Sequence, residues 1–224
     1  MEDLTLKRLT AIVGHYGSGK TEVTINLAKT FCKRYKLLVM DMDTVNPYFR
    51  TVDARDHFDE LKIKLVAPRY ANTNVDVPAL PQDVNIAFDD KSYTVLMDVG
   101  GDDDGAVVLS TYRGRIKQED YDMFAVVNER RLQTNTVEKS LIYLQAIEKA
   151  SGLKVTGIIN NTNLGNLTDI NLLENSVEYM EELSRKCGLP VVATAVKREL
   201  LTDAAHFDSF VLPMDIHIKR VWEE

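Results

Sequence analysis

The stretch Gly14-His-Tyr-Gly-Ser-Gly-Lys-Thr21 decides the fold of this chain. It satisfies the pattern GxxxxGK[ST], in which glycines let the backbone curl until several N–H groups face one phosphate group. An apolar run at residues 9–13 precedes it, and a segment of helical periodicity starts at Lys20. The positive end of that helix then points at the same phosphate. The stretch therefore predicts a phosphate-binding loop, or P-loop, between a first strand and a first helix.

Two side chains of this loop have expected chemical roles at a bound nucleoside triphosphate. Lys20 bridges the β- and γ-phosphates and meets the charge that develops during hydrolysis, so it is the first candidate catalytic residue. The Thr21 hydroxyl is expected to ligate Mg²⁺. We expect the nucleotide to contact the whole loop and the residue after it, namely Gly14, His15, Tyr16, Gly17, Ser18, Gly19, Lys20, Thr21 and Glu22.

Short apolar runs alternate with longer segments of helical period, which is the pattern of βα units that feed a mostly parallel sheet. Strands are expected at residues 9–13, 37–40, 63–66, 94–97, 123–127, 155–159 and 191–195, with a weaker eighth at 210–212. Amphipathic helices are expected at residues 20–35, 136–150 and 169–186. We therefore predict one domain over residues 1–224, an α/β three-layer sandwich with seven to eight strands and the P-loop NTPase fold.

Carboxylates follow two of the expected strands, in Asp41-Met-Asp43 and in Asp98-Val-Gly-Gly101. Magnesium beside a triphosphate needs oxygen ligands at a neighbouring strand end. We predict Asp41 and Asp98 as residues of the metal site and Asp43 as the group that activates the attacking water. Gly100 is expected to donate its N–H to the γ-phosphate. The alternatives are a helix cap at Asp98 and, after Asp41 and Asp43, a polar turn initiated by Asn46-Pro47.

Polar residues after two later strands are candidates for recognition of a purine base. Asn160 opens the run Asn-Asn-Thr-Asn, whose amides can donate to and accept from the base, and Lys197 follows the next strand. The alternative is that this run only forms a loop and does not contact a base. Three arginines are further candidates for binding phosphate: Arg50, Arg113 and Arg115. For each of them the alternative is a solvated position on the surface.

The charge balance and the apolar pattern exclude several classes of function. With a net charge of −7 and no basic stripe, the chain is not expected to bind nucleic acid directly. No apolar run approaches the roughly 18 residues of a membrane span, and the first residues lack the apolar core of a signal peptide. Cys32 and Cys187 show no metal-binding spacing. We expect a cytoplasmic protein without stable membrane association.

The order of these motifs resembles the MinD/ParA/CobQ-type members of the SIMIBI branch of P-loop NTPases. The resemblance rests on GHYGSGKT at 14–21, DMDTVNP at 41–47, DVGG at 98–101 and NNTN at 160–163; DMDTVNP also resembles in part the GPN-loop small GTPases. It implies Mg²⁺ and ATP as cofactors, GTP as an alternative, a protein client, and possible homodimers. His15 stands where dimerising members have a second lysine, and a mostly neutral imidazole does not replace that charge.

Together these features predict a nucleotide-hydrolysing switch. ATP is favoured over GTP through the resemblance, because NNTN lacks the acidic residue of the guanine-reading NKxD motif. One alternative is a small-molecule phosphotransferase or ATP-dependent ligase with an acceptor pocket at residues 69–81. Another is a binding module in which the nucleotide only stabilises the fold.

Overall fold

The computed structural model describes residues 3–43, 55–67, 84–204 and 206–217, apart from the side chains of residues 102–104. Its eight strands form one sheet in the order β3-β2-β4-β1-β5-β6-β7-β8, and all neighbouring pairs are parallel. The bounds are β1 Leu9–Val13, β2 Leu37–Asp41, β3 Lys64–Val66, β4 Thr94–Asp98, β5 Tyr121–Val127, β6 Gly157–Asn160, β7 Val191–Lys197 and β8 Phe210–Met214.

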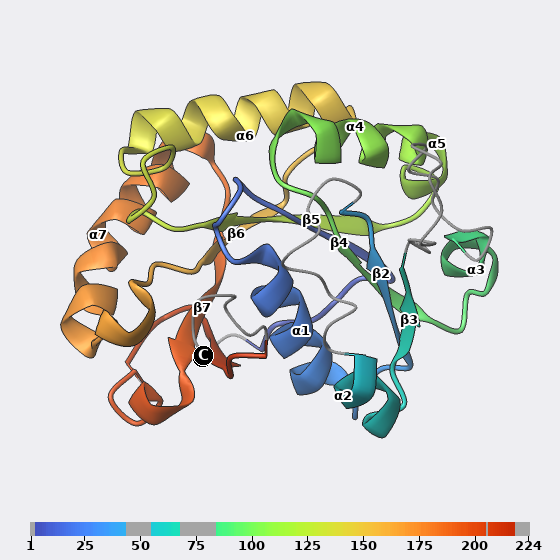
Figure 1. The fold of residues 1–224 in the computed structure, drawn as a ribbon. Helices are drawn as coiled ribbons and strands as arrows, with labels where there is room; N and C mark the ends of the chain where they lie inside the picture. Colours follow the sequence, from blue (N-terminus) through green and yellow to red (C-terminus); the bar gives the residue numbers. More distant parts are fainter. Residues whose placement is uncertain (1–2, 44–54, 68–83, 205, 218–224) are drawn as a thin grey trace, which may run out of the picture.

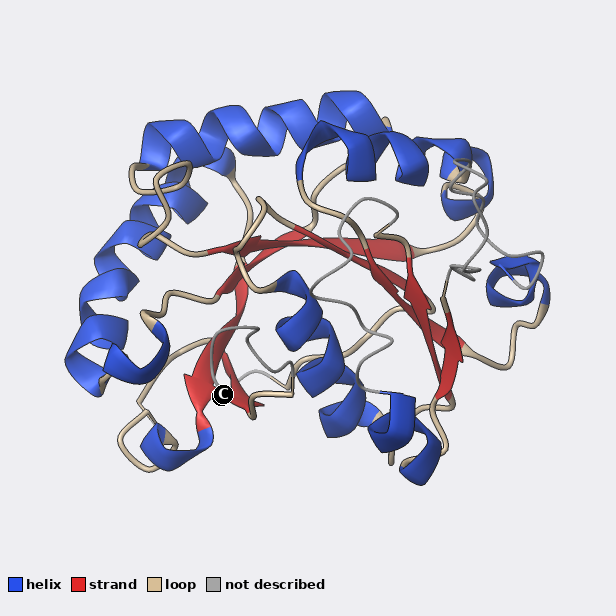
Figure 2. Ribbon diagram, viewed as in Figure 1, coloured by secondary structure: helices blue, strands red, loops and turns tan. Residues whose placement is uncertain are grey.

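Helices cover both faces of this sheet (Figure 1, Figure 2). Buried side chains of α1 and α2 belong to the apolar cluster on one face, and those of α3 to α6 belong to the cluster on the other, together with part of α7. The α-helices are α1 Lys20–Phe31, α2 Arg55–Glu60, α3 Val84–Asp89, α4 Asp102–Thr111, α5 Arg113–Ile116, α6 Val137–Ser151 and α7 Ile170–Cys187. The predicted three-layer α/β sandwich is confirmed.

The strands form where the sequence has nearly continuous apolar runs. In β1, Ala11 packs into the cluster beneath α4 and α6, while Ile12 packs into the cluster beneath α1. A strand buried on both faces needs apolar residues at successive positions, and each fully buried Leu or Ile contributes about 1.5–3 kcal/mol. All eight predicted strands are present, with bounds that differ by at most two residues at either end.

The helices differ in how they begin. The Thr136 side chain accepts a hydrogen bond from Lys139 N at the start of α6, and the Asp169 side chain accepts one from Leu172 N at the start of α7. Helix α1 begins instead after Gly19, in the left-handed region with φ 89°, and has no side-chain cap. Helix α1 thus starts without the side-chain acceptor that α6 and α7 have.

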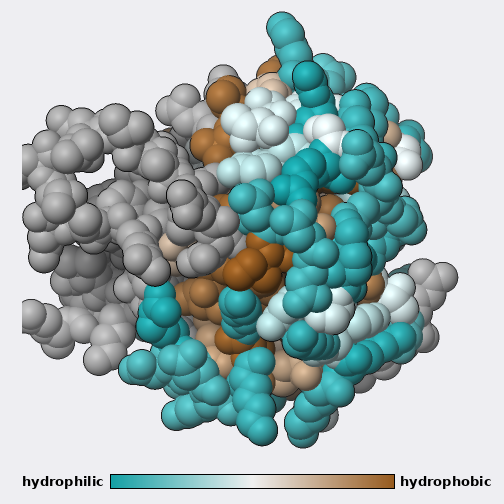
Figure 3. Space-filling model, turned by 90° about the vertical axis from the view of Figure 1, so that its right-hand side faces the viewer, coloured by the Kyte–Doolittle hydropathy of each residue, from teal (hydrophilic) through white to brown (hydrophobic). Residues whose placement is uncertain are grey.

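On the side where β3 lies in Figure 1, hydrophobic residues show in the middle of the surface, with hydrophilic residues to their right and below them (Figure 3). Two buried residues of the apolar clusters, Val66 and Ile63, belong to β3 and the residue before it. The layered core therefore extends to this edge of the sheet.

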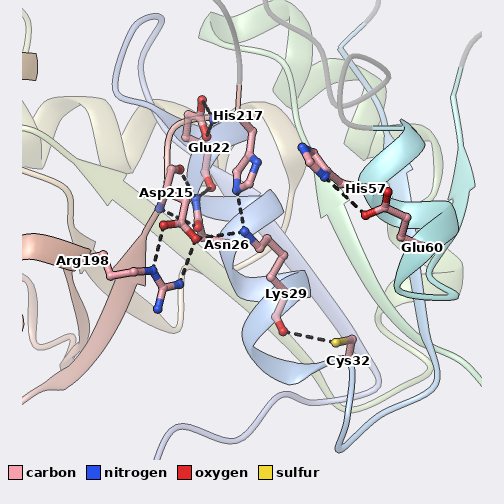
Figure 4. Close-up of polar contacts among 9 residues, drawn as sticks. All are labelled: Glu22, Asn26, Lys29, Cys32, His57, Glu60, Arg198, Asp215 and His217. Atoms are coloured by element: carbon pink, nitrogen blue, oxygen red, sulfur yellow. Dashed lines mark hydrogen bonds and ion pairs between the residues drawn. The ribbon is translucent and has the colours of Figure 1, made fainter.

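The segment after β8 is tied to helix α1 (Figure 4). The Asp215 carboxylate accepts from Lys29 Nζ at 2.9 Å and from the Arg198 guanidinium at 2.8 and 2.9 Å. Asn26 donates to Asp215 O and accepts from Asp215 N, both at 2.9 Å. We call residues 215–217 the C-terminal clamp, because they fix α1 against β8.

His217 completes this clamp. Its backbone N–H donates to the Glu22 carboxylate at 3.0 Å, and its ring lies 5.2 Å, centroid to centroid, from the ring of His57 in α2. Burial, the nearby Lys29 ammonium and His57 lower the pKa of the His217 ring to about 4. The clamp thus links the first turn of α1 to α2. Residues 215–217 are not helical, and residues 218–224 lie outside the described residues.

Replacing Asp215 by Asn should destabilise the fold, because it weakens the bonds to Arg198 and Lys29. The Arg198 guanidinium and the Lys29 ammonium hold the pKa of the Asp215 carboxyl well below its ordinary value. Since the group is partly exposed and screened by solvent, we expect a loss of only about 1 kcal/mol in the free energy of unfolding, measured by urea denaturation. Glu138→Gln, which breaks a more exposed pair with Lys186, is the control. Equal losses in both variants would contradict the clamp.

The melting temperature should fall as the pH drops from about 6.5 towards 4. The folded protein holds His217 neutral, whereas the unfolded chain protonates it near its ordinary pKa of 6.5. This stability is fully present above that pH and is lost as the pH falls through the folded pKa. His217→Gln should flatten the curve in this window when melting is followed by circular dichroism. An unchanged curve would show that His217 does not titrate with folding.

Candidate functional site

The ends of three adjacent strands bring the predicted site together. Asp41 at the end of β2 is paired with Asp98 at the end of β4, which in turn is paired with Ile12 of β1. The ladder continues past the strand ends, since Met42 N donates to Asp98 O at 2.8 Å and Val99 N to Ile12 O at 3.1 Å. The chain order reverses here, with β4 on one side of β1 and β5 on the other. Ligands of parallel α/β sheets bind at such a point.

The P-loop has the backbone that its glycines allow. Gly17 and Gly19 lie at φ 74° and 89°, where other residues are strained. Ser18 N donates to His15 O at 3.0 Å, which closes the turn. Because α1 begins here without a side-chain cap, the N–H groups of the turn and of the first helical residues form a place for an anion.

Lys20 is the positive charge of this site. Only 7% of the residue is exposed, and its Nζ donates to His15 O at 3.1 Å. The backbone after β4 packs directly on it: a Cβ atom placed on Gly101 would lie 3.2 Å from Lys20 Nζ and 2.9 Å from the Tyr16 backbone. The turn between β4 and α4 therefore contacts the P-loop at Gly101, where a side chain would not fit.

The predicted carboxylates surround the same corner. Asp41 and Asp98 are each 1% exposed, and Asp43 is 9% exposed. Asp43 N donates to Asp41 Oδ1 at 3.0 Å, and a Cβ atom on Gly100 would lie 3.1 Å from Asp43 Oδ1. The structure thus places Asp43 against Gly100.

The donor chemistry at this corner fits Mg²⁺. The described residues contain no group of three or more His, Cys, Asp or Glu side chains able to hold a metal. Magnesium does not need one, because it binds one or two carboxylates or hydroxyls together with nucleotide phosphates and water. Thr21, Asp41 and Asp98 supply hard oxygen atoms of this kind.

Asn160 and its neighbour Asn161 occupy different environments. The Asn160 amide donates to Ser176 Oγ at 2.9 Å and accepts from Thr162 N at 3.0 Å, and the residue is 1% exposed. Asn161 instead donates from Nδ2 to Ser18 O at 2.7 Å. Asn161, which the sequence analysis missed, is therefore the residue of this run that touches the P-loop. Base recognition by Asn160 stays a prediction.

Three other residues predicted to contact the nucleotide, His15, Glu22 and Lys197, have these neighbours in the structure. The His15 ring packs on the Tyr143 ring at 5.4 Å, and its Nδ1 lies 2.9 Å from Tyr16 O. The Glu22 carboxylate accepts from the C-terminal clamp, and Lys197 Nζ lies 3.5 Å from a Glu199 carboxylate oxygen.

The structure places two of the three candidate arginines. Arg115 donates to Asn85 and pairs with Asp89, and Arg113 lies beside Gly152. These contacts are made on α3 and at the end of α6. Arg50 and the acceptor segment at residues 69–81 lie outside the described residues.

No protein-family model and no curated protein matches this sequence. Solved structures do. Chloroplast FtsY from Physcomitrella patens matches with a TM-score of 0.58 and 19% identity over 86% of this chain and 59% of its own. FtsY from Thermotoga maritima, a cell division protein, matches with a TM-score of 0.57 and 19% identity over 84% of this chain and 61% of its own.

The chain has the P-loop NTPase fold. A third similar structure is the signal recognition particle receptor FtsY from Elizabethkingia anophelis in complex with GDP, with a TM-score of 0.52 and 16% identity over 87% of this chain and 59% of its own. The chain thus spans about three-fifths of the length of these proteins. At such identities the likeness is one of fold. Within the described ranges, no helix is both long and apolar enough to cross a membrane.

Replacing Gly101 by Ala should distort the P-loop, because the new methyl group would collide with the Tyr16 backbone and press on Lys20. We expect a loss of about 1–3 kcal/mol in the free energy of unfolding, as for other overpacked sites. Gly114→Ala is the matched control, since a Cβ atom there meets nothing within 4 Å and the residue lies in α5. Chemical denaturation of both variants tests this. Equal stability of the two would contradict the close approach.

Proposed function

We propose that this protein is a Mg²⁺-dependent nucleoside triphosphate hydrolase that works as a switch on a protein client in the cytoplasm. The observation that carries the proposal is the meeting of three features at one sheet edge. The first is a glycine loop that leads into α1, which has no side-chain cap, and the second is the buried Lys20. The third is the pair of carboxylates, Asp41 and Asp98, at the ends of the adjacent strands β2 and β4.

The residues divide the work of hydrolysis among them. Loop N–H groups and Lys20 bind the phosphates, and Lys20 exchanges its bond to His15 O for phosphate oxygens. Asp43 orients a water molecule and accepts a proton from it as the water oxygen attacks the γ-phosphorus and the bond to the β-phosphate oxygen breaks. Magnesium held by Thr21, Asp41 and Asp98 supplies charge neutralisation at the phosphates when bound.

The position of Asp43 supports a switch. Asp43 lies against Gly100, and both belong to turns that leave the sheet beside the P-loop. Gly100 donates its N–H to the γ-phosphate, so that loss of this phosphate removes a contact shared by both turns. The client would then bind differently to the triphosphate and diphosphate states. Sedimentation with and without triphosphate tests whether nucleotide drives homodimerisation; His15 in place of the family's second lysine is the feature that argues against it.

The nucleotide is GTP or ATP, and both are measured in the test below. The preference for ATP drawn from the sequence has no supporting contact in the described residues. The FtsY structure with GDP makes GTP the first nucleotide to measure.

Purified protein with Mg²⁺ should release phosphate from GTP or ATP. Lys20→Ala should reduce release by about 10²–10³-fold, because it removes the charge that meets the developing negative charge. Asp43→Asn should reduce release by about 10²-fold and leave nucleotide affinity near that of the wild type. Lys154→Ala, an exposed lysine paired with Glu148, serves as the control.

The outcomes separate the hypotheses. Tight binding without phosphate release from either nucleotide, with or without a client, would favour the binding module. No binding of either nucleotide by folded wild-type protein would remove the proposal.

A further inference from the structure

The loop between β5 and α6 is a rigid structure beside the P-loop. Asn128, which is fully buried, accepts on its carbonyl oxygen from Arg131 N at 3.1 Å and from Thr134 Oγ1 at 2.6 Å. Thr134 N donates back to Arg131 O at 3.0 Å. Arg131 therefore sits at the tip of a turn whose backbone is closed on both sides.

This loop is also tied to the loop after β6. Asn128 Nδ2 donates to Asn163 O at 3.2 Å, and Glu129 N donates to Thr162 Oγ1 at 3.4 Å. The same β6 loop holds the P-loop through Asn161 and Ser18. The position of Arg131 relative to the P-loop is thus set by hydrogen bonds on buried groups.

Two adjacent arginines in this loop have different surroundings. Arg130 pairs with Glu129 at 3.0 Å. Burial raises the pKa of the Glu129 carboxyl. Arg131 is exposed, and no described residue forms a hydrogen bond or ion pair with its guanidinium. Its Nε lies 4.0 Å from the place where a Cβ atom on Gly17 would stand.

We propose that Arg131 binds the phosphate chain of the nucleotide, as a positive charge additional to Lys20. This inference rests on the proposed function and adds a residue to the same site. Gly17 belongs to the turn whose N–H groups face the phosphates, and the terminal guanidinium nitrogens lie beyond the Nε that already approaches Gly17. A guanidinium offers paired donors that match phosphate oxygens and keeps its charge at every physiological pH.

The chemistry of the loop favours an anion as the partner. The nearest carboxylate in sequence, Glu129, already pairs with Arg130. The turn bonds of Asn128 and Thr134 hold the backbone of Arg131. Binding therefore requires ordering of the side chain alone, which makes the contact favourable at a modest entropic cost.

The test is nucleotide affinity, measured by calorimetry with the non-hydrolysable imido analogues of GTP and ATP plus Mg²⁺. Arg131→Ala should raise the Kd about tenfold, equal to about 1.4 kcal/mol. Arg131→Glu should raise it further, and Arg131→Lys should restore part of the affinity. Arg130→Ala, the matched control, should stay within about twofold of the wild type, since its partner is Glu129.

A merely structural role predicts other results. The melting temperature of the free Arg131 variants should equal that of the wild type, because the side chain is exposed. Their affinity should also depend less on salt concentration, since one charged contact is gone. Unchanged affinity in Arg131→Ala and Arg131→Glu, or an equal effect of Arg130→Ala, would overturn the inference.

The same experiment separates this inference from the proposed function. If the wild type binds the analogues, Lys20→Ala abolishes binding and Arg131→Ala does not weaken it, only the role of Arg131 fails. If the wild type binds neither analogue, the proposed function fails and the role of Arg131 falls with it.

Discussion

The parallel register of β2, β4 and β1 is the constraint on which the candidate site depends. Pairing of Asp41 with Asp98, and of Asp98 with Ile12, places two carboxylates one strand spacing apart beside the turn that follows β1. A shift of one residue would turn these side chains to the opposite face of the sheet. Because side chains of these strands are closely packed against helices on both faces, the shapes of those side chains oppose that shift. The packing of the core therefore also fixes the position of the acidic groups.

The described loops at this edge of the sheet contact one another directly. Gly101 packs on the P-loop backbone, and Asn161 donates to Ser18 O from the opposite side. The C-terminal clamp fixes α1 through Glu22, the residue next to Thr21. A site built from such short contacts is organised before any ligand arrives, which lowers the cost of binding.

Much of the fold could be predicted from the sequence, because strands buried on both faces leave continuous apolar runs and P-loops leave a readable pattern. The short helices α2 and α3 could not, since six residues are too few to show a helical period. Their positions depend on how Phe58 and Phe88 pack against the sheet.

The site shows the same division. Asp41, Asp43 and Asp98 could be proposed from the sequence because they stand at or just after the ends of expected strands. The difference between Asn160 and Asn161 could not be predicted, because it depends on tertiary contacts: Asn160 ends β6 and bonds to Ser176 of α7, whereas Asn161 follows the strand and bonds to the P-loop. The approach of Arg131 to Gly17 joins residues far apart in the sequence, and it becomes visible only once β5 lies next to β1.

The uncapped start of α1 has a practical consequence for handling the protein. The positive end of α1 next to Lys20 attracts small anions as well as nucleotides. Sulfate or inorganic phosphate in a purification buffer would occupy it, raise the thermal stability by mass action and compete with added nucleotide. Preparations in chloride and in phosphate would then differ in measured affinity although the polypeptide is the same.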